Sequence, residues 1–209
     1  ESYIKIKVID NINYIKSLKE YKDLFEHDYL IINGKEYKNI NLLEKYISLE
    51  KLYDIFKNDI NSSIHGDLTI DNIICIKKSR KTDYYLIDPN PSNLLTSKYM
   101  DYGKILQSLH GGYEFLREIK NVNIDGNSIS YVFTKSKCYT ELYSKYVIFL
   151  ENNFDYDAIK SIYFHEIIHW LRLLPYKSKD YVKFVVSYTR FIIVLNEIID
   201  MYGVDKHEK

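Results

Sequence analysis

Cysteine is scarce in this chain, whose 209 residues include only Cys75 and Cys138. Two cysteines form no disulfide framework, which excludes a small extracellular domain stapled by disulfides. We also recognise no secretory leader. The sequence therefore predicts a cytoplasmic protein in which both cysteines are buried, reduced thiols.

Long apolar runs and an excess charge are also absent. The strongest apolar run, Phe191–Leu195, is short and lies between Arg190 and Glu197, whereas a membrane-spanning helix needs roughly 18–20 apolar residues. The 29 basic and 29 acidic side chains balance, so no overall field attracts nucleic acid or an anionic membrane. We therefore expect neither a membrane span nor a nucleic-acid partner.

Periodic apolar segments account for most of the chain, in which 46% of the residues are hydrophobic. Their spacing predicts helices over 11–27, 41–56, 98–109, 137–152, 157–174 and 179–202, the last two ended by Pro175 and Gly203. Alternation and turn residues such as Asn33-Gly34 predict a strand over 3–9 and hairpins over 29–37, 73–88 and 116–134. Together they indicate one α+β domain, mainly helical, with small β-hairpins.

The most informative segment is the run His65-Gly66-Asp67-Leu68-Thr69-Ile70-Asp71-Asn72, which is followed by Asp88 after Leu86-Ile87. An Asp, four residues, an Asn and a later Asp at a strand end is the spacing of a kinase-like phosphoryl-transfer site. One carboxylate takes the acceptor's proton, while an amide oxygen and a second carboxylate hold Mg²⁺. The hairpin predicted between them brings Asn72 and Asp88 side by side.

This pattern resembles the catalytic and metal-binding loops of the aminoglycoside phosphotransferase and choline kinase families, which are relatives of protein kinases. With Asp101–Tyr113 and Leu171–Tyr176, it is more narrowly similar to phosphotransferase-like domains of bacterial capsule and surface-polysaccharide gene clusters. Similar domains there are sometimes joined to a sugar nucleotidyltransferase. The resemblance covers residues 29–202 and is strongest over 65–113.

The resemblance implies the C-terminal lobe of a kinase-like fold and a role for five residues. Asp67 would orient the acceptor hydroxyl and accept its proton, and Asn72 and Asp88 would hold Mg²⁺. His65 would brace the loop, and Asp101 would buttress that loop or cap the following helix. The implied reaction moves the γ-phosphate of ATP or GTP to a hydroxyl of a sugar, polyol or amino-alcohol in surface-polysaccharide metabolism.

The acceptor's binding residues are also implied by the resemblance, since C-terminal helices of these families supply acids and aromatics to the acceptor. The matching candidates in this chain are Tyr113, Glu114, Glu166 and His169.

The chain departs from the kinase pattern in two places. Asp88-Pro89-Asn90 stands where protein kinases have Asp-Phe-Gly, which excludes a conventional protein kinase. Only Gly34 and Gly66 precede Asp67, so the chain has no glycine-rich loop over the phosphates. We therefore expect a C-terminal lobe alone, part of a longer protein, with weak or no ATP turnover by itself. Its partner would be an upstream N-terminal lobe or a nucleotidyltransferase domain of the same protein.

Within a single domain over 1–209, we expect a lead-in over 1–60, the catalytic and metal loops over 61–113, and a helical part over 114–209.

A rival motif is His165-Glu166-Ile167-Ile168-His169, the zinc-peptidase signature of two imidazoles one helical turn apart with a glutamate as general base. Glu197 is a candidate third ligand. Apolar residues cover most of the helix, so we expect its one polar stripe to face water or a cleft; the stripe comprises Ser161, His165, Glu166, His169 and Arg172. Three functions therefore stay open: a small-molecule phosphotransferase, an inactive kinase-like binding module, and a zinc hydrolase.

Overall fold

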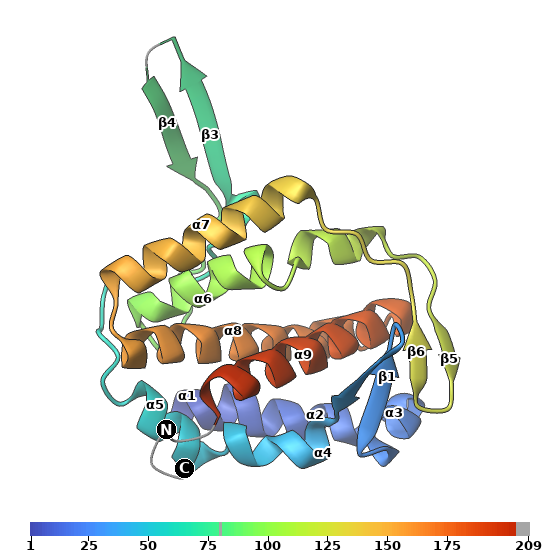
Figure 1. Ribbon diagram of the computed structural model, residues 1–209. Coiled ribbons are helices and arrows are strands. Elements are labelled where there is room, and N and C mark those ends of the chain that lie inside the picture. Colours follow the sequence, from blue (N-terminus) through green and yellow to red (C-terminus); the bar gives the residue numbers. More distant parts are fainter. Residues whose placement is uncertain (80, 204–209) are drawn as a thin grey trace.

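The computed structural model describes residues 1–79 and 81–203, which form an α+β fold dominated by helices. Figure 1 shows three layers: α6 (Lys98–Leu109) with α7 (Lys137–Asn153), α8 (Tyr156–Lys177) with α9 (Tyr181–Tyr202), and the N-terminal helices. Helix α8 lies at the centre and contacts α2, α5, α6, α7 and α9. The α+β class is confirmed, and none of the described helices is long and apolar enough to cross a bilayer.

The two long C-terminal helices form the core because they are apolar on nearly every side. Trp170 on α8 and Phe191 on α9 are fully buried. Asp155 caps α8 by accepting a hydrogen bond from the Ala158 N–H, and Asp180 caps α9 in the same way. The sequence predicted that Pro175 ends α8, but the helix continues past it to Lys177. Proline removes only one helical N–H, and Ser178 continues the last turn by bonding the Pro175 carbonyl.

The N-terminal segment is helical, so the strand predicted over residues 3–9 is wrong. The chain runs through α1 (Ser2–Ile4), a π-helical turn η1 (Lys5–Ile9) and α2 (Asp10–Ser17). Its buried side chains Ile4, Val8, Ile12 and Ile15 recur at helical spacing. Packing of this face against α8 overrides the weak alternation that suggested a strand.

Two predicted helices are broken into shorter pieces. The segment predicted as a helix over 11–27 continues after α2 as η2 (Lys19–Tyr21) and α3 (Lys22–Glu26). The segment 41–56 consists of α4 (Ile40–Leu43), η3 (Glu44–Ile47) and α5 (Leu49–Phe56). The second break occurs because Ser48 has an extended backbone and caps α5 through its hydroxyl.

A four-stranded sheet joins distant parts of the chain. The predicted hairpin at Asn33-Gly34 is confirmed as β1 (Tyr29–Ile32) and β2 (Lys35–Lys38), with positive φ at both turn residues. Strand β6 (Ser128–Ser130) pairs in parallel with β1, and β5 (Asn123–Asp125) pairs with β6. The hairpin predicted over 116–134 is shorter than expected, because residues Tyr113–Glu118 form a 3-10 helix, η5.

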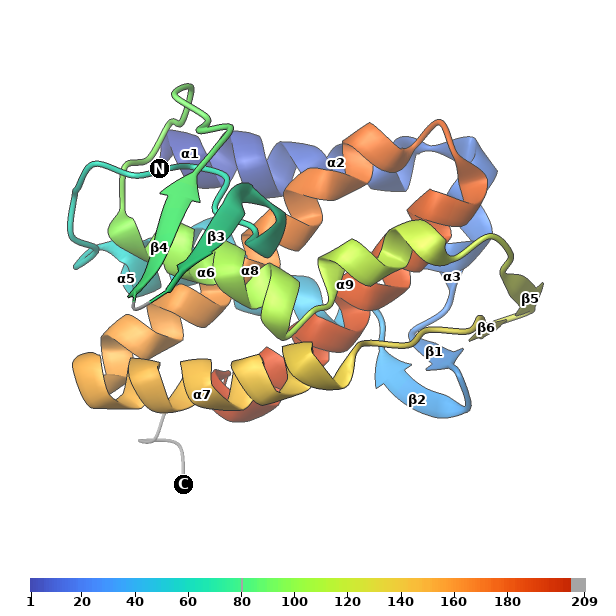
Figure 2. The ribbon, with the colours of Figure 1, turned by 90° about the horizontal axis from the view of Figure 1, so that it is seen from above.

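The hairpin of β3 (Ile73–Lys78) and β4 (Lys81–Leu86) is confirmed and stands away from the helices, above α6 (Figures 1 and 2). Arg80, in its predicted basic tip, lies outside the described residues. Cys75 on β3 and Cys138 on α7 are free and exposed. The prediction of buried thiols is wrong because Cys75 lies on the protruding hairpin and Cys138 lies on the outer side of the first turn of α7.

Candidate active site

The loop that begins at His65 is anchored on helix α6 by Asp101. One carboxylate oxygen of Asp101 accepts the His65 N–H at 2.7 Å, and the other accepts the Gly66 N–H at 2.8 Å. Gly66 has a φ of +80°, and a Cβ there would lie 2.5 Å from the Asn90 carbonyl oxygen, so glycine is required twice over. Asp101 therefore buttresses the loop through its backbone, while Ser97 caps α6.

His65 links this loop to the segment that carries Asp88. Its Nε2 donates to the Ile87 carbonyl at 2.8 Å, and its own carbonyl accepts the Asn90 N–H at 2.8 Å. Between these two bonds Asp88 has a φ of +55°, a left-handed backbone conformation that residues other than glycine rarely adopt. Such backbone strain persists only where neighbouring contacts impose it, and it is frequent at functional sites.

Asn72 lies beside that segment, at the start of the β3–β4 hairpin. Its carbonyl accepts the Ile87 N–H at 3.1 Å, which brings its backbone next to the residue before Asp88. Its side-chain nitrogen donates to the Asp67 carbonyl at 2.8 Å. Since a carbonyl only accepts hydrogen bonds, the Asn72 side chain must turn its nitrogen toward the Asp67 carbonyl. The amide oxygen of Asn72 is then the atom left for a ligand.

Asp67 forms an ion pair with a residue that the sequence analysis did not single out, Lys104. The Lys104 ammonium lies 2.9 Å from one Asp67 oxygen, and the side chains are 15% and 45% exposed, respectively. Burial lowers the pKa of Lys104, an effect that Asp67 partly offsets. The available signal was the spacing of Asp101 and Lys104, which places both on one face of a helix.

Two further contacts hold the loop at Ile70 and Asp71. The Ser108 hydroxyl accepts the Ile70 N–H at 3.1 Å and donates to Glu114 at 2.6 Å. Arg117 binds the Asp71 carboxylate at 2.6 Å. Glu114 is buried, which raises its pKa, so this predicted acceptor ligand instead positions the loop. Tyr113 remains next to the site and half-buried.

The histidines of the zinc-peptidase signature have separate internal partners. His165 donates from Nε2 to Asp59 at 2.7 Å, and His169 donates from Nε2 to the Met100 carbonyl at 2.9 Å. Burial, with Lys104 and Arg172 nearby, lowers the pKa of His169 well below its ordinary value. Within residues 1–79 and 81–203, no group of three or more His, Cys, Asp or Glu side chains is arranged to hold a metal.

Glu166 belongs to a buried cluster on the other side of α8. Its carboxylate accepts from Nδ1 of His110 at 2.9 Å and from the indole N–H of Trp170 at 3.3 Å. Glu197 lies 3.3 Å from the other nitrogen of His110. Burial lowers the pKa of His110, but the two carboxylates outweigh it and raise that pKa to about 9.

Most of the polar stripe of α8 is buried, whereas the sequence predicted that it faces water or a cleft. Ser161, His165, Glu166 and His169 are buried because helices α5, α6 and α9 cover α8 on several sides; Arg172 is half-buried, and Ser161 borders a surface pocket near Asp59. The acceptor contacts predicted for Glu166 and His169 do not fit these positions.

Comparisons of the chain with models of protein families, with curated proteins and with solved structures found no match. The resemblance to phosphotransferases stays a prediction. The residues around Asp67 and their hydrogen bonds are the basis on which a function is proposed below.

Proposed function

We propose that this chain carries the catalytic half of a small-molecule phosphotransferase, which moves the γ-phosphoryl group of ATP or GTP to an alcohol. The observation that carries the proposal is that three side chains hold the two loops on which Asp67 and Asp88 lie. Asp101, His65 and the amide nitrogen of Asn72 all bond backbone groups of the two loops. Asp67 and Asp88 remain partly or fully exposed between these anchors. Phosphoryl transfer depends on this kind of positioning, since the protein itself does little covalent chemistry.

The donors near the hairpin suit Mg²⁺. This ion prefers oxygen ligands and is commonly held by one or two carboxylates together with phosphates of the substrate. The amide oxygen of Asn72 and the exposed carboxylate of Asp88 are such ligands and lie on adjacent backbone segments. When bound there, Mg²⁺ would neutralise charge on the nucleotide's phosphates.

Asp67 has the second role, at the acceptor. Lys104 occupies one of its oxygens, so the other is left to accept a hydrogen bond from the acceptor's hydroxyl and then its proton. The Lys104 ammonium lies beside the reacting groups in a largely buried position, where a fixed positive charge stabilises developing negative charge more strongly than in water.

The nucleotide's base would be held by a part of the protein beyond these residues. The β3–β4 hairpin exposes large side chains such as Ile74 (44%), Tyr84 (66%) and Leu86 (46%). A lone two-stranded hairpin is only marginally stable in water. An upstream N-terminal lobe, or another domain of the same protein, would cover this hairpin and complete the nucleotide site.

The test is metal-nucleotide binding by this chain and by any longer natural form of the protein. Calorimetry with Mg²⁺-ATP and Mg²⁺-GTP measures the affinity, and Mn²⁺ in place of Mg²⁺ broadens the NMR signals of residues next to the metal. We expect broadening centred on Asn72 and Asp88, and a loss of affinity of at least about tenfold in Asp88→Ala, since a charge-assisted metal contact is lost. Asp83→Ala, an acid on the same hairpin, is the matched control.

Equal binding by Asp88→Ala and Asp83→Ala, or no binding by any form, would sink the proposal. Asp88-dependent binding with no phosphoryl transfer to any alcohol would identify a kinase-like binding module without turnover.

A further inference from the structure

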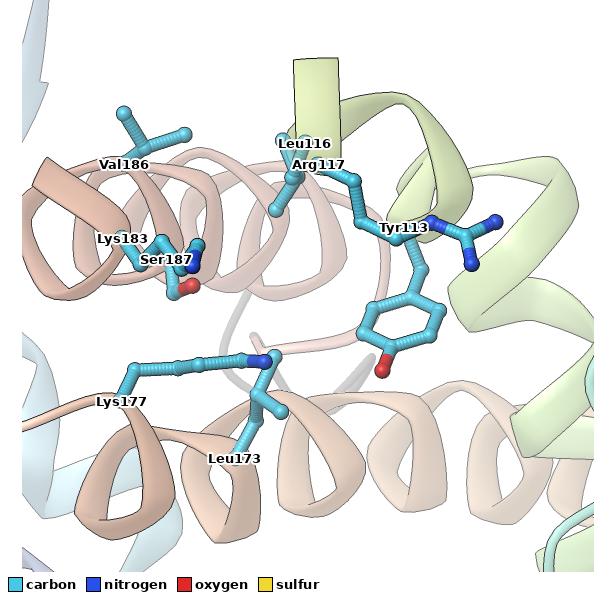
Figure 3. A pocket seen from close by; sticks show the side chains of 8 residues that line it. All are labelled: Tyr113, Leu116, Arg117, Leu173, Lys177, Lys183, Val186 and Ser187. Atoms are coloured by element: carbon cyan, nitrogen blue, oxygen red, sulfur yellow. The ribbon is translucent and has the colours of Figure 1, made fainter. Parts of the chain in front are cut away.

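A cavity of about 210 Å³ lies beside the proposed active site, between η5, the end of α8 and the start of α9 (Figure 3). Leu116, Leu173 and Val186 form its apolar wall. Its polar residues are Tyr113, Arg117, Lys177, Lys183 and Ser187, and we call this set the cationic pocket.

Basic residues from three different elements line the cationic pocket, and none of the lining residues is acidic. Figure 3 shows the Arg117 guanidinium turned away from Lys177 and Lys183, so the two lysines carry the charge that faces the pocket. Arg117 and Lys183 have acid partners outside the lining, Asp71 at 2.6 Å and Asp180 at 3.0 Å. Lys177 forms no direct ion pair with any of the described residues, although its charge contributes to lowering the pKa of Asp180. Figure 3 shows its side chain extended along α8, with the ammonium beside Leu173. Its charge is therefore available to a ligand.

Tyr113 separates the cationic pocket from the catalytic carboxylate. Its ring forms part of the pocket wall, and the Lys104 ammonium that pairs with Asp67 lies 5.8 Å from the ring centre. Burial raises the pKa of Tyr113, and the nearby Asp67 raises it further. The cationic pocket and the Asp67–Lys104 ion pair therefore have Tyr113 as a common neighbour.

We propose that the cationic pocket binds an anionic group of the acceptor, so that the acceptor is a sugar or polyol that already carries a phosphate or carboxylate. The assignment rests on the proposed function. The ammonium groups of Lys177 and Lys183 and the Ser187 hydroxyl are donors of the kind that recognise such anions. The same charges repel a cationic amino-alcohol, which removes one of the acceptor classes considered above.

The size of the pocket agrees with this assignment. Cavities for drug-sized ligands measure roughly 300–1,000 Å³, so about 210 Å³ suits one anionic group and part of a sugar ring. The rest of the acceptor would extend past Tyr113. The reacting hydroxyl oxygen then bonds to the γ-phosphorus, the bond from that phosphorus to the β–γ bridging oxygen breaks, and Asp67 takes the hydroxyl proton.

The test uses four sugars of one skeleton at low ionic strength, without nucleotide: glucose 6-phosphate, glucuronate, glucose and glucosamine. NMR titration of the whole chain gives each affinity and locates binding through the amides of Tyr113, Lys177 and Ser187. We expect at least one anionic sugar to bind about tenfold more tightly than glucose and glucosamine, as charge-assisted contacts predict. Comparison of the first two sugars tells phosphate from carboxylate.

Two variants localise the effect. Lys177→Gln should lower the affinity for the anionic sugar about tenfold, whereas Lys179→Gln, an exposed lysine two residues away, should leave it unchanged. Equal binding of glucose and the anionic sugars, or equal binding by both variants, would overturn the assignment.

This failure is distinguishable from failure of the proposed function. Asp88-dependent nucleotide binding without anion selectivity removes only the anionic acceptor. Selective anion binding without any nucleotide binding leaves an anion site and removes its role as an acceptor site.

Discussion

Residues 65–72 and residues 165–169 both combine histidine with carboxylates, yet the fold uses them in opposite ways. In the first segment His65 and the distant Asp101 bond backbone groups, and Asp67 stays accessible. In the second, His165 and Glu166 bond other side chains in the interior and are fully buried. In residues 65–72 the Asp67 carboxylate is therefore accessible from outside, whereas in residues 165–169 neither His165 nor Glu166 is.

The two motifs differ in whether their polar atoms have partners inside the protein. Ligand and proton chemistry needs donor or acceptor atoms that have no internal partner, while buried polar groups need partners for stability. The segment around Asp67 meets the first requirement, and the α8 segment meets the second at every ring nitrogen and carboxylate bond described above, with Nδ1 of His165 as the buried atom that lacks a partner. The comparison therefore favours a site at the loop and a structural role on α8.

The largest expected effect is on stability, from Glu166→Ala on α8. This change leaves His110 and Trp170 without their buried acceptor, and removal of one partner of a buried ion pair costs about 3–5 kcal/mol. Urea unfolding measures it, with the exposed Glu118→Ala as the control expected within about 0.5 kcal/mol of the unchanged protein. Equal stability of the two variants would contradict a structural role for Glu166.

A pH titration tests the same cluster from the side of His110. Its pKa is raised from an ordinary 6.5 to about 9, so its protonated form stabilises the fold. The stabilisation is complete below about pH 6.5 and is lost as the pH rises through about 9, with a total of about 3 kcal/mol. Urea unfolding at several pH values measures this slope, and His110→Gln should remove it. A slope that persists in His110→Gln would assign the pH dependence to other groups.

A smaller and more local effect is expected at the loop. Asp101→Asn keeps the shape of the side chain but leaves one acceptor oxygen for two N–H groups, at a cost of about 1–3 kcal/mol. Hydrogen exchange of the His65 and Gly66 amides should accelerate. Asp125→Asn, at the exposed end of strand β5, is the control. If exchange at these amides stays slow, Asp101 does not hold the loop in solution.

No effect at all is expected from zinc. The Nε2 atoms of His165 and His169 face Asp59 and the Met100 carbonyl, so an equimolar amount of Zn²⁺ finds no paired imidazoles. Thermal unfolding with Zn²⁺ and with a chelator should give the same midpoint. A rise of several degrees that disappears in His169→Gln would reverse the comparison between the two motifs.

Several local elements could be predicted because their signals are local. Helix α6 begins and ends at the predicted residues, after its cap Ser97, and the Asn33-Gly34 turn forms the predicted hairpin. The strand predicted at the N-terminus is wrong, since the helical spacing of Ile4, Val8, Ile12 and Ile15 prevails over a weaker alternation. A short amphipathic segment fits either period until its packing partner is known.

The candidate site also combines features that follow from local sequence with features that depend on packing. The approach of Asn72 to Asp88 follows from local sequence, because these residues flank a hairpin whose strands pair in register. The pairing of Lys104 with Asp67 and the burial of Glu166 and His169 come from the packed fold alone. Burial and pairing depend on neighbours that lie far apart along the chain, and these meet only when helices α6, α8 and α9 pack together.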